Sequence, residues 1–383
     1  MNFDLTEEQQ ILVDSVAKFV QNDSPVERFR KLRDTERGWD PTTWARMGEF
    51  GWLGVVFPEE HGGFGGQFVD LALILEQLGR GLVAEPLIPS VVLAGGLLSE
   101  LGTAAQREQF LTPMIEGRTS LALAYAERQS RYSANDCQTR AEKRGTGWAL
   151  SGEKTWVLNG HAADQILVLA RTSGDSLDAE GLSLFVVDGD AAGLERIRVP
   201  GMDGQRSALL RLRGVEVGAD RLLGEEGRAL LPLERTLDRA AAAACAEGQG
   251  EIQELFERTV AYLKQRSQFG VPIGSFQALQ HRAADMYAET ELCRSTMILA
   301  AIAADYEDRE KRQAEISAAK LQLSRGGWFV QGNAIQLFGG IGVTDEQDEG
   351  LFFKRLRVLQ GLFGDADWHV ARYQGLPGFG SDE

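Results

Sequence analysis

Apolar residues recur at three- and four-residue spacing through the first third of the chain, which is the pattern of amphipathic helices. Thr6 stands three positions before Gln9 at the start of the first such stretch, an arrangement that predicts a capping box. The helices expected in this part span residues 6–21, 41–50, 69–82, 88–101 and 104–116. A glycine-rich turn at 61–66 interrupts them. Residues 1–118 are therefore predicted to form an N-terminal helical domain.

After residue 118 the pattern changes to short runs of apolar, β-branched and aromatic residues between turns, as in β-strands. The expected strands span residues 119–126, 147–158, 164–171, 182–188 and 208–217. Most of the gaps between them carry no helical pattern, which favours an antiparallel sandwich or barrel over a βαβ sheet. Residues 119–227 are therefore predicted to form a central β domain.

Helical spacing returns near residue 228 and continues to the end of the chain. Four long stretches are expected, over residues 228–264, 276–307, 312–338 and 346–372. Long helices joined by short loops pack as antiparallel neighbours, so residues 228–383 are predicted to form a C-terminal four-helix bundle. The fold class is thus α+β with several domains, and the tail from residue 377 is expected to fray.

Composition narrows the possible functions. Apolar residues make up 43% of the chain and charged residues 25%, a mixture typical of folded globular proteins. The formal net charge of -16 argues against binding to nucleic acid or to anionic membranes. Three cysteines and four histidines lack the spacing of a disulfide framework or a metal site, so no metal is expected. The sequence shows no leader or long apolar stretch, and a cytoplasmic location is expected.

Four segments in order along the chain carry a resemblance to a known family. They are FPEEHGGFGG (57–66), GEKTWVLNG (152–160), RSQFGVPIGSFQALQHRAADM (266–286) and QLFGGIGVTDE (336–346). Together with the order of helical, β and helical domains, they make the chain similar to flavin-dependent acyl-CoA dehydrogenases over nearly its whole length. The resemblance implies FAD as cofactor, an acyl-CoA substrate, an assembly of identical or sister chains, and electron-transfer flavoprotein as electron acceptor.

The resemblance also implies which residues hold the cofactor. Arg266 and Phe269 match the segment by which one subunit reaches the FAD of its neighbour, and Trp156 matches a tryptophan that packs against the flavin ring. The remaining residues of the implied cradle are Gln277, Gln336, Gly339 and Gly340. Taken without the resemblance, Arg266 is a solvated charge, Phe269 and Trp156 are core residues, and the glycines end a helix.

Some family positions are altered in this sequence. Leu158 and Ala126 stand where the family commonly has threonines that contact the flavin, and Tyr132 stands where it has a serine that contacts phosphate. These replacements imply flavin binding that is weakened or rearranged relative to the family.

The family needs a carboxylate that removes the α proton of the thioester, because that proton is only weakly acidic. The two positions at which relatives place it hold Phe363 and Ala240 here. Glu247 lies seven residues, or two helical turns, from Ala240 and so on nearly the same helical face. It is the predicted base, and its alternative role is a salt bridge within a packed helix pair. Asp365 is a second candidate, although its place before a helix is also that of an N-cap.

With its displaced or missing glutamate, the chain resembles the bacterial branch of the family that acts on steroid side-chain or pimeloyl thioesters. In that branch two unlike chains can assemble. Two main functions follow: a dehydrogenase that forms an α,β double bond, or a non-catalytic subunit that completes the FAD site of a sister chain. A third keeps the fold but uses reduced flavin and oxygen, as monooxygenase relatives do.

Overall fold

The structure of the chain is a computed structural model that describes residues 5–377. It contains two compact units. The helical unit comprises Met1–Lys31, Phe68–Val83 and Ala241–Glu383, and the sheet unit comprises Leu32–Gln67 and Ala84–Ala240. The segment predicted as the N-terminal helical domain contributes to both units. Most of the tail predicted to fray, residues 378–383, lies outside the described residues. None of the described helices combines the length and the apolar character that crossing a membrane requires.

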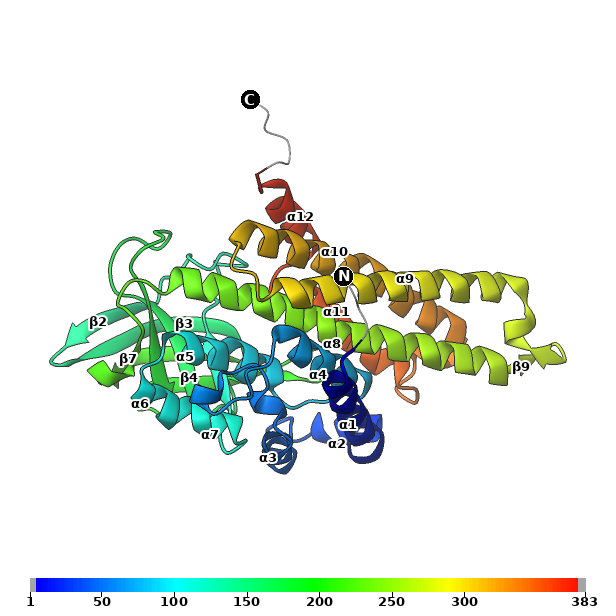
Figure 1. The fold of residues 1–383 in the computed structure, drawn as a ribbon, viewed down its shortest axis with the longest axis horizontal. Helices are drawn as coiled ribbons and strands as arrows, with labels where there is room; N and C mark the ends of the chain where they lie inside the picture. Colours follow the sequence, from blue (N-terminus) through cyan, green and yellow to red (C-terminus); the bar gives the residue numbers. More distant parts are fainter. Residues whose placement is uncertain (1–4, 378–383) are drawn as a thin grey trace. The chain divides into compact units, whose positions relative to one another are not determined.

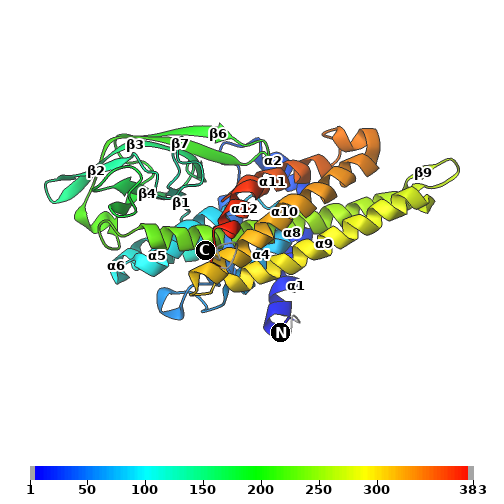
Figure 2. The same ribbon diagram turned by 90° about the horizontal axis from the view of Figure 1, so that it is seen from above.

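The helical unit contains the long helices of the C-terminal segment. Its helices are α1 (Glu7–Asp23), α2 (Val26–Leu32), α4 (Phe68–Arg80), α8 (Leu230–Gln265), α9 (Gln277–Ala303), α10 (Arg309–Phe338), α11 (Glu349–Gly361) and α12 (Ala366–Gln374), with a 3-10 turn at η7 (Gly339–Val343). The first residues of α8 belong to the sheet unit. Figures 1 and 2 show α8 and α9 lying side by side, joined by a small hairpin. α10 packs against α9, α11 and α12. The predicted bundle is thus confirmed in its long helices.

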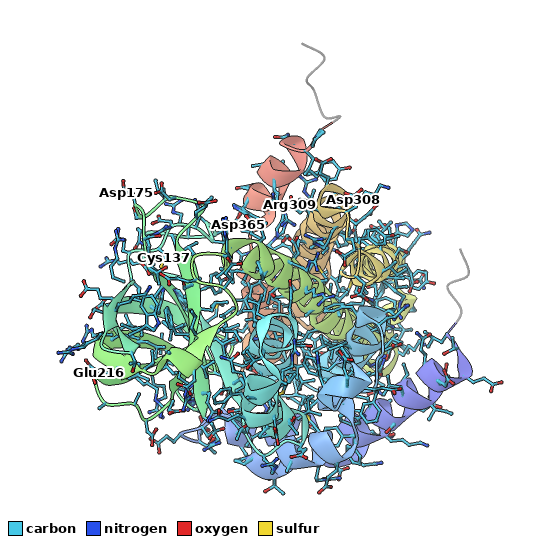
Figure 3. The ribbon with its side chains drawn as sticks, turned by 60° about the vertical axis from the view of Figure 1, so that its left-hand side comes forward. Cys137, Asp175, Glu216, Asp308, Arg309 and Asp365 are labelled. Carbon is cyan, nitrogen blue, oxygen red and sulfur yellow. The ribbon has the colours of Figure 1, made fainter. Side chains whose placement is uncertain are left out.

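Side chains cap several of these helices. The capping box predicted at α1 is present: the backbone N of Gln9 donates to Thr6 Oγ1 (3.2 Å), and the backbone N of Thr6 donates to Gln9 Oε1 (3.1 Å). Asp308 caps α10 and Asp365 caps α12, and both residues are labelled in Figure 3. The caps satisfy backbone N–H groups that have no partner within their helix.

The last predicted helix, 346–372, is wrong as a single element, since it is divided into α11 and α12. Phe363 and Gly364 between them have φ angles of +59° and +112°, which a helix does not contain. Asp365 then starts α12 through its carboxylate, which accepts from the backbone N of Trp368 (2.9 Å).

Glycines allow α4 and α8 to touch through their backbones. A Cβ on Gly250 would lie 1.8 Å from the carbonyl oxygen of Glu76, and one on Gly79 would lie 2.2 Å from that of Glu247. Neither position can accept a side chain without moving a helix. The two helices are therefore held at one specific distance.

The sheet unit combines short helices with one mixed sheet. The helices are α3 (Pro41–Glu49), η1 (Trp52–Gly54), η2 (Glu59–His61), η3 (Ile88–Gly95), α5 (Gly96–Leu101), α6 (Ala104–Gln106), η4 (Arg107–Leu111), α7 (Thr112–Ile115) and η5 (Ala219–Arg221). The predicted helices 88–101 and 104–116 each contain a π-helical part, η3 and η4.

The sheet has the strand order β6-β7-β3-β2-β4-β5-β8, with β1 paired to β4. Its strands are β1 (Leu121–Ala124), β2 (Arg140–Arg144), β3 (Gly147–Leu158), β4 (Gln165–Arg171), β5 (Leu182–Asp188), β6 (Leu194–Pro200), β7 (Arg206–Val217) and β8 (Leu222–Leu223). The expectation of antiparallel pairing is wrong for β1 with β4 and for β2 with β4, which are parallel. Side chains from β1 to β5 and from β7 meet in one apolar core, so the sheet curls around them.

Candidate functional site

Trp156 in the sheet unit lies in a β-bulge. The pairing of β3 with β7 jumps from Lys154 opposite Leu210 to Val157 opposite Ala208, which leaves one extra residue on β3. Trp156 has a φ of +51° there and its side chain is 61% exposed. The alternative that Trp156 is a core tryptophan is therefore wrong. The bulge presents a large aromatic surface that nothing in the core covers.

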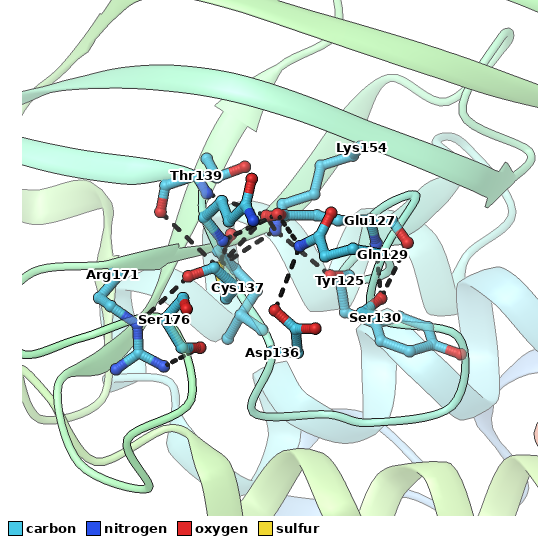
Figure 4. A network of polar contacts seen from close by, with 12 residues as sticks. Tyr125, Glu127, Gln129, Ser130, Asp136, Cys137, Thr139, Lys154, Arg171 and Ser176 are labelled. Atoms are coloured by element: carbon cyan, nitrogen blue, oxygen red, sulfur yellow. Dashed lines mark hydrogen bonds and ion pairs between the residues drawn. The ribbon is translucent and has the colours of Figure 1, made fainter.

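Two residues before that tryptophan, Lys154 on β3 forms a buried ion pair with Glu127 (Figure 4). Lys154 Nζ lies 2.7 Å from Glu127 Oε1 and also donates to the Tyr125 carbonyl (3.2 Å). The backbone N of Gln138 donates to Glu127 Oε2 (2.8 Å). Cys137 Sγ lies 3.4 Å from both charged groups.

The charges of this pair are well compensated. Although burial alone would raise the pKa of Glu127, the Lys154 ammonium and the N–H donors around it lower that pKa to about 2. Burial raises the pKa of the Cys137 thiol, so the thiol stays protonated. Thr155, next to Lys154, donates its backbone N–H to the Ala126 carbonyl (2.9 Å). The network therefore holds the bulge in place, while Cys137 is not an activated nucleophile.

Six of the predicted cofactor residues lie in the helical unit and all are exposed. Arg266 and Phe269 lie on the hairpin of β9 (Ser267–Gln268) and β10 (Val271–Pro272), followed by the turn η6 (Ile273–Ser275). Phe269 is 92% exposed with a φ of +56°, so the alternative of a core phenylalanine is wrong. Gln277 opens α9, whose N-cap makes no side-chain hydrogen bond, so backbone N–H groups are left for an anion.

The hairpin lies close to the end of α10, where the other three residues of this group are. Tyr262 stacks on Phe338 with ring centroids 4.3 Å apart, and its hydroxyl donates to the Phe338 carbonyl (3.4 Å). Gln336, Gly339 and Gly340 adjoin Phe338 and are exposed. A Cβ on either glycine would meet open space, so these glycines do not serve packing within the chain.

Glu247, the predicted base, forms an ion pair between α8 and α11. Nε and one terminal nitrogen of Arg355 both lie 2.7 Å from Glu247 Oε1. The two side chains are 12% and 8% exposed, respectively. Glu251, one turn further along α8, is fully buried and lies 3.9 Å from Arg355. No described residue hydrogen-bonds Glu247 Oε2, so one of its two oxygens is held and the other is open.

The alanine run before Glu247 is a packing face. Residues 240–246 are all almost completely buried. A Cβ on the following Gly248 would lie 2.6 Å from a methyl group of Leu323 on α10. The run therefore packs closely, and at Gly248 the helix α10 comes too near to leave room for a side chain.

The loop between α11 and α12 contains Phe363, at one of the two positions where the family resemblance implies a carboxylate. Lys320, fully buried on α10, donates to the carbonyls of Leu359 (2.7 Å), Gln360 (3.3 Å) and Leu362 (2.7 Å) at the end of α11. His369 Nε2 lies 3.1 Å from the Phe363 carbonyl, which assigns the proton to Nε2.

Burial shifts both of the titratable groups that hold this loop. It lowers the pKa of Lys320 to about 8, and burial together with Arg372 and Lys320 lowers the pKa of His369 to about 2. His369 is therefore neutral and Lys320 charged at neutral pH, so the loop keeps its hydrogen bonds. Asp365 is used as the N-cap of α12, in agreement with its alternative role.

Sequence reasoning missed these buried charges. Lys320 lies at helical spacing from the buried Ile316 and Leu323, and Lys154 lies on the same face of β3 as the buried Trp148 and Leu150. Both could have been recognised in the sequence, because each is a charged residue at a position where the periodicity predicts a buried one. Within residues 5–377, no three His, Cys, Asp or Glu side chains are grouped to hold a metal ion.

Comparison with known proteins places the chain among relatives along its whole length. The N-terminal, middle and C-terminal domain descriptions of acyl-CoA dehydrogenase match residues 6–118, 122–215 and 232–372. A probable acyl-CoA dehydrogenase of Bacillus subtilis, YngJ, is 32% identical over 352 residues, covering 90% of this chain and 91% of its own.

Two solved structures are similarly close. Butyryl-CoA dehydrogenase from Megasphaera elsdenii superposes with a TM-score of 0.90 at 27% identity, covering 98% of this chain and 99% of that chain. A chain of the ChsE4–ChsE5 complex from Mycobacterium tuberculosis superposes with a TM-score of 0.86 at 27% identity, covering 97% of each chain.

Proposed function

We propose that this chain, which belongs to the acyl-CoA dehydrogenase family, is an FAD-dependent dehydrogenase that forms an α,β double bond in an acyl-CoA thioester. Glu247 is its base, and the observation that supports this role is that the two oxygens of its carboxylate have different surroundings. Arg355 holds Oε1, whereas Oε2 has no hydrogen-bond partner among the described residues.

The exposed groups of the chain fit the cofactor. Trp156 offers an aromatic face for a flavin ring, and Phe269 offers a second ring for an adenine. Arg266 and the free N-terminus of α9 offer positive charge and N–H donors for a pyrophosphate. Because Arg266 and Phe269 project on a hairpin, we propose that they serve the FAD of a neighbouring chain, as the family resemblance implies.

The chemistry requires a base that is held still and kept largely dry. Arg355 fixes the Glu247 carboxylate, and Oε2 takes the α proton as the α C–H bond breaks and the double bond forms. FAD, when bound, accepts the β hydrogen as a hydride. The 12% exposure of the Glu247 side chain provides a route for the proton to leave.

The test is the substitution Glu247→Gln, because a glutamine keeps an oxygen for Arg355 while losing the base. The variant should fold and bind FAD, but a suitable acyl-CoA should no longer bleach the flavin absorbance. Glu254→Gln is the matched control: Glu254 lies seven residues further on α8, pairs with Arg80 and Arg258, and is 18% exposed. Bleaching by Glu247→Gln at the wild-type rate would remove Glu247 from the reaction.

A second candidate is a non-catalytic subunit that completes the FAD site of a sister chain. It is favoured by Phe363 and Ala240, both without a carboxylate, and by the ion pair that occupies Glu247. The likeness to a chain of the ChsE4–ChsE5 complex supports an assembly of two unlike chains. This candidate predicts little flavin in the chain purified alone and recovery of flavin on co-expression with a sister chain. Turnover of acyl-CoA by the chain alone would exclude it.

Electron-transfer flavoprotein is the acceptor we propose for the electrons of the reaction. Reduced enzyme should be reoxidised faster by that protein than by dissolved oxygen, which stopped-flow absorbance would measure.

A further inference from the structure

Two carboxylates of α8 lie against the same guanidinium. Two nitrogens of Arg355 on α11 lie 2.7 Å from Glu247 Oε1, and Arg355 Nε lies 3.9 Å from Glu251 Oε1. The two glutamates are four residues apart on α8, so their side chains lie on one face of that helix, one above the other. All three residues belong to the helical unit and are here called the glutamate–arginine triad.

Burial distinguishes the two glutamates of the triad. The side chain of Glu247 is 12% exposed, whereas that of Glu251 is fully buried. A base must reach the proton that it removes, so the exposed part of Glu247 suits that task and Glu251 does not. Any part that Glu251 plays in proton transfer therefore acts through Arg355, which contacts both glutamates.

A second buried carboxylate is unfavourable, and a structural clamp does not require it. Like charges four residues apart destabilise a helix, and each ion that is taken out of water carries a desolvation penalty. One carboxylate is enough for Arg355 to hold α11 against α8. Elsewhere on α8 the ratio of charges is reversed, since Glu254 pairs with two arginines, Arg80 and Arg258. The presence of Glu251 beside Glu247 therefore calls for a role other than packing.

The proposed reaction changes the charge that Arg355 faces. Glu247 becomes neutral when its Oε2 takes the α proton, and Arg355 then loses the negative charge with which it was paired. A buried guanidinium without a counter-charge is strongly unfavourable. Glu251 is placed to supply that charge, because closing the separation of 3.9 Å to a charge-assisted hydrogen bond of about 2.8 Å needs a movement of about 1 Å.

We infer that Glu251 is a positioning residue for the proposed base Glu247. It pairs with Arg355 while Glu247 carries the α proton, and Arg355 returns to Glu247 when that proton leaves. The guanidinium is thus paired throughout the reaction, and the Glu247 carboxylate regains its orientation after each turnover. The inference rests on the proposed function for the source of the proton, whereas the sharing of Arg355 by two carboxylates is a property of the chain itself.

A double-mutant cycle, measured by urea unfolding of the full chain, tests the sharing without any turnover. Glu247→Gln mimics the protonated base, because its amide is neutral and keeps an oxygen for Arg355. In the wild type, Glu251→Gln should lower the urea midpoint only slightly, since Arg355 keeps Glu247. In the Glu247→Gln background the same substitution removes the second carboxylate of the triad as well, and the midpoint should fall at least about twice as far.

Glu254→Gln is the matched control in this cycle, because Glu254 lies on α8 and pairs with Arg80 and Arg258. It should lower the midpoint equally in the wild type and in the Glu247→Gln background. Equal losses for Glu251→Gln in the two backgrounds would overturn the inference, since Glu251 would then act independently of Glu247. Glu251→Met, which removes the charge with a side chain of similar length, serves in the same cycle if Glu251→Gln does not fold.

Bleaching of the flavin distinguishes a positioning role from a packing role. The probes are butyryl-CoA and longer straight-chain acyl-CoA thioesters. Glu251→Gln should slow bleaching at saturating substrate about tenfold, whereas the substrate concentration for the half-maximal rate and the flavin content should stay unchanged. Glu254→Gln should bleach at the wild-type rate.

The two measurements separate this inference from the proposed function. Bleaching by Glu251→Gln at the wild-type rate would overturn the positioning role, even if the unfolding cycle shows coupling. If the wild type itself does not bleach with any probe, the proposed function is removed, and the unfolding cycle still decides whether the two glutamates share Arg355.

Discussion

The buried pair of Lys154 and Glu127 makes a quantitative prediction about stability. The substitution Lys154→Met keeps the length of the side chain but removes its charge, and Glu127 remains 5% exposed without its cation. Breaking a buried pair in this way typically costs about 3–5 kcal/mol. The lower end applies here, because the backbone N–H groups of Gln138 and Thr139 and the amide of Gln129 still donate to the Glu127 carboxylate.

The pKa of Glu127 gives a second estimate of how much the contacts of its carboxylate contribute to the stability of the fold. It is lowered from 4.5 to about 2 in the folded chain, so the unfolded chain binds the proton more tightly. Each unit is worth about 1.4 kcal/mol, which amounts to about 3 kcal/mol of stability present above the unfolded pKa. That stability is lost as the pH falls from about 4.5 toward 2, and about 2 kcal/mol of it is gone at pH 3.

Urea unfolding of wild type and Lys154→Met, followed by circular dichroism at a fixed protein concentration, measures both quantities. We expect the variant to lose about 3 kcal/mol at pH 7, and the difference between the two proteins to narrow as the pH is lowered below 4.5. Lys143→Met is the control, because Lys143 and its partner Glu226 are exposed and such pairs contribute at most about 1 kcal/mol. A loss under about 1 kcal/mol for Lys154→Met, with unchanged acid dependence, would refute the reasoning.

Three further outcomes are expected from the helical unit, each measured by the same urea unfolding. His369 has a lowered pKa, so the wild type should lose about 2 kcal/mol between pH 7 and pH 5 as the unfolded chain takes up a proton, and His369→Gln should not show this loss. Lys320 also has a lowered pKa, so the stability of the wild type should rise from about pH 8 to about pH 10.5, and Lys320→Met, although less stable throughout, should lack that rise. Gly250→Ala should destabilise the protein by about 3 kcal/mol or more, because the added Cβ would lie 1.8 Å from the Glu76 carbonyl oxygen. Gly332→Ala is the control: it has open space around it and should stabilise the protein by about 0.5–1 kcal/mol. Equal effects of the two substitutions would contradict the packing of α4 against α8.

Periodicity predicted the elements whose burial follows one period. The strands β3 and β5 and the helix α10 lie where alternation or helical spacing places them. By contrast, β2 and β6 were missed, because Arg140–Arg144 is almost entirely charged and the charges of Leu194–Pro200 interrupt its apolar residues. Both strands are defined by hairpin pairing with the next strand, β2 with β3 and β6 with β7, and the apolar pattern within each strand does not reveal that pairing.

The residues of the candidate site that could be predicted are those that lie in recognisable sequence motifs. Arg266, Phe269 and Trp156 carry recognisable motifs, and the structure places all three at the surface. Arg355 could not be predicted as the partner of Glu247, since 108 residues separate them and only the packing of α11 on α8 brings them together. Spacing predicts which face of a helix a residue occupies but not what that face meets.

The loop between α11 and α12 is held by hydrogen bonds that leave no free carboxylate in it for a base. Lys320 binds three carbonyls at the end of α11, and neutral His369 holds the carbonyl of Phe363. Asp365, the nearest carboxylate in this loop, already caps α12 through the backbone N of Trp368. Turning Asp365 toward a substrate would uncap that helix, at a cost of about 1 kcal/mol. Glu247 needs no such rearrangement, because one of its oxygens is open while Arg355 keeps the other in place. Of these two carboxylates, Glu247 is therefore the base that we propose.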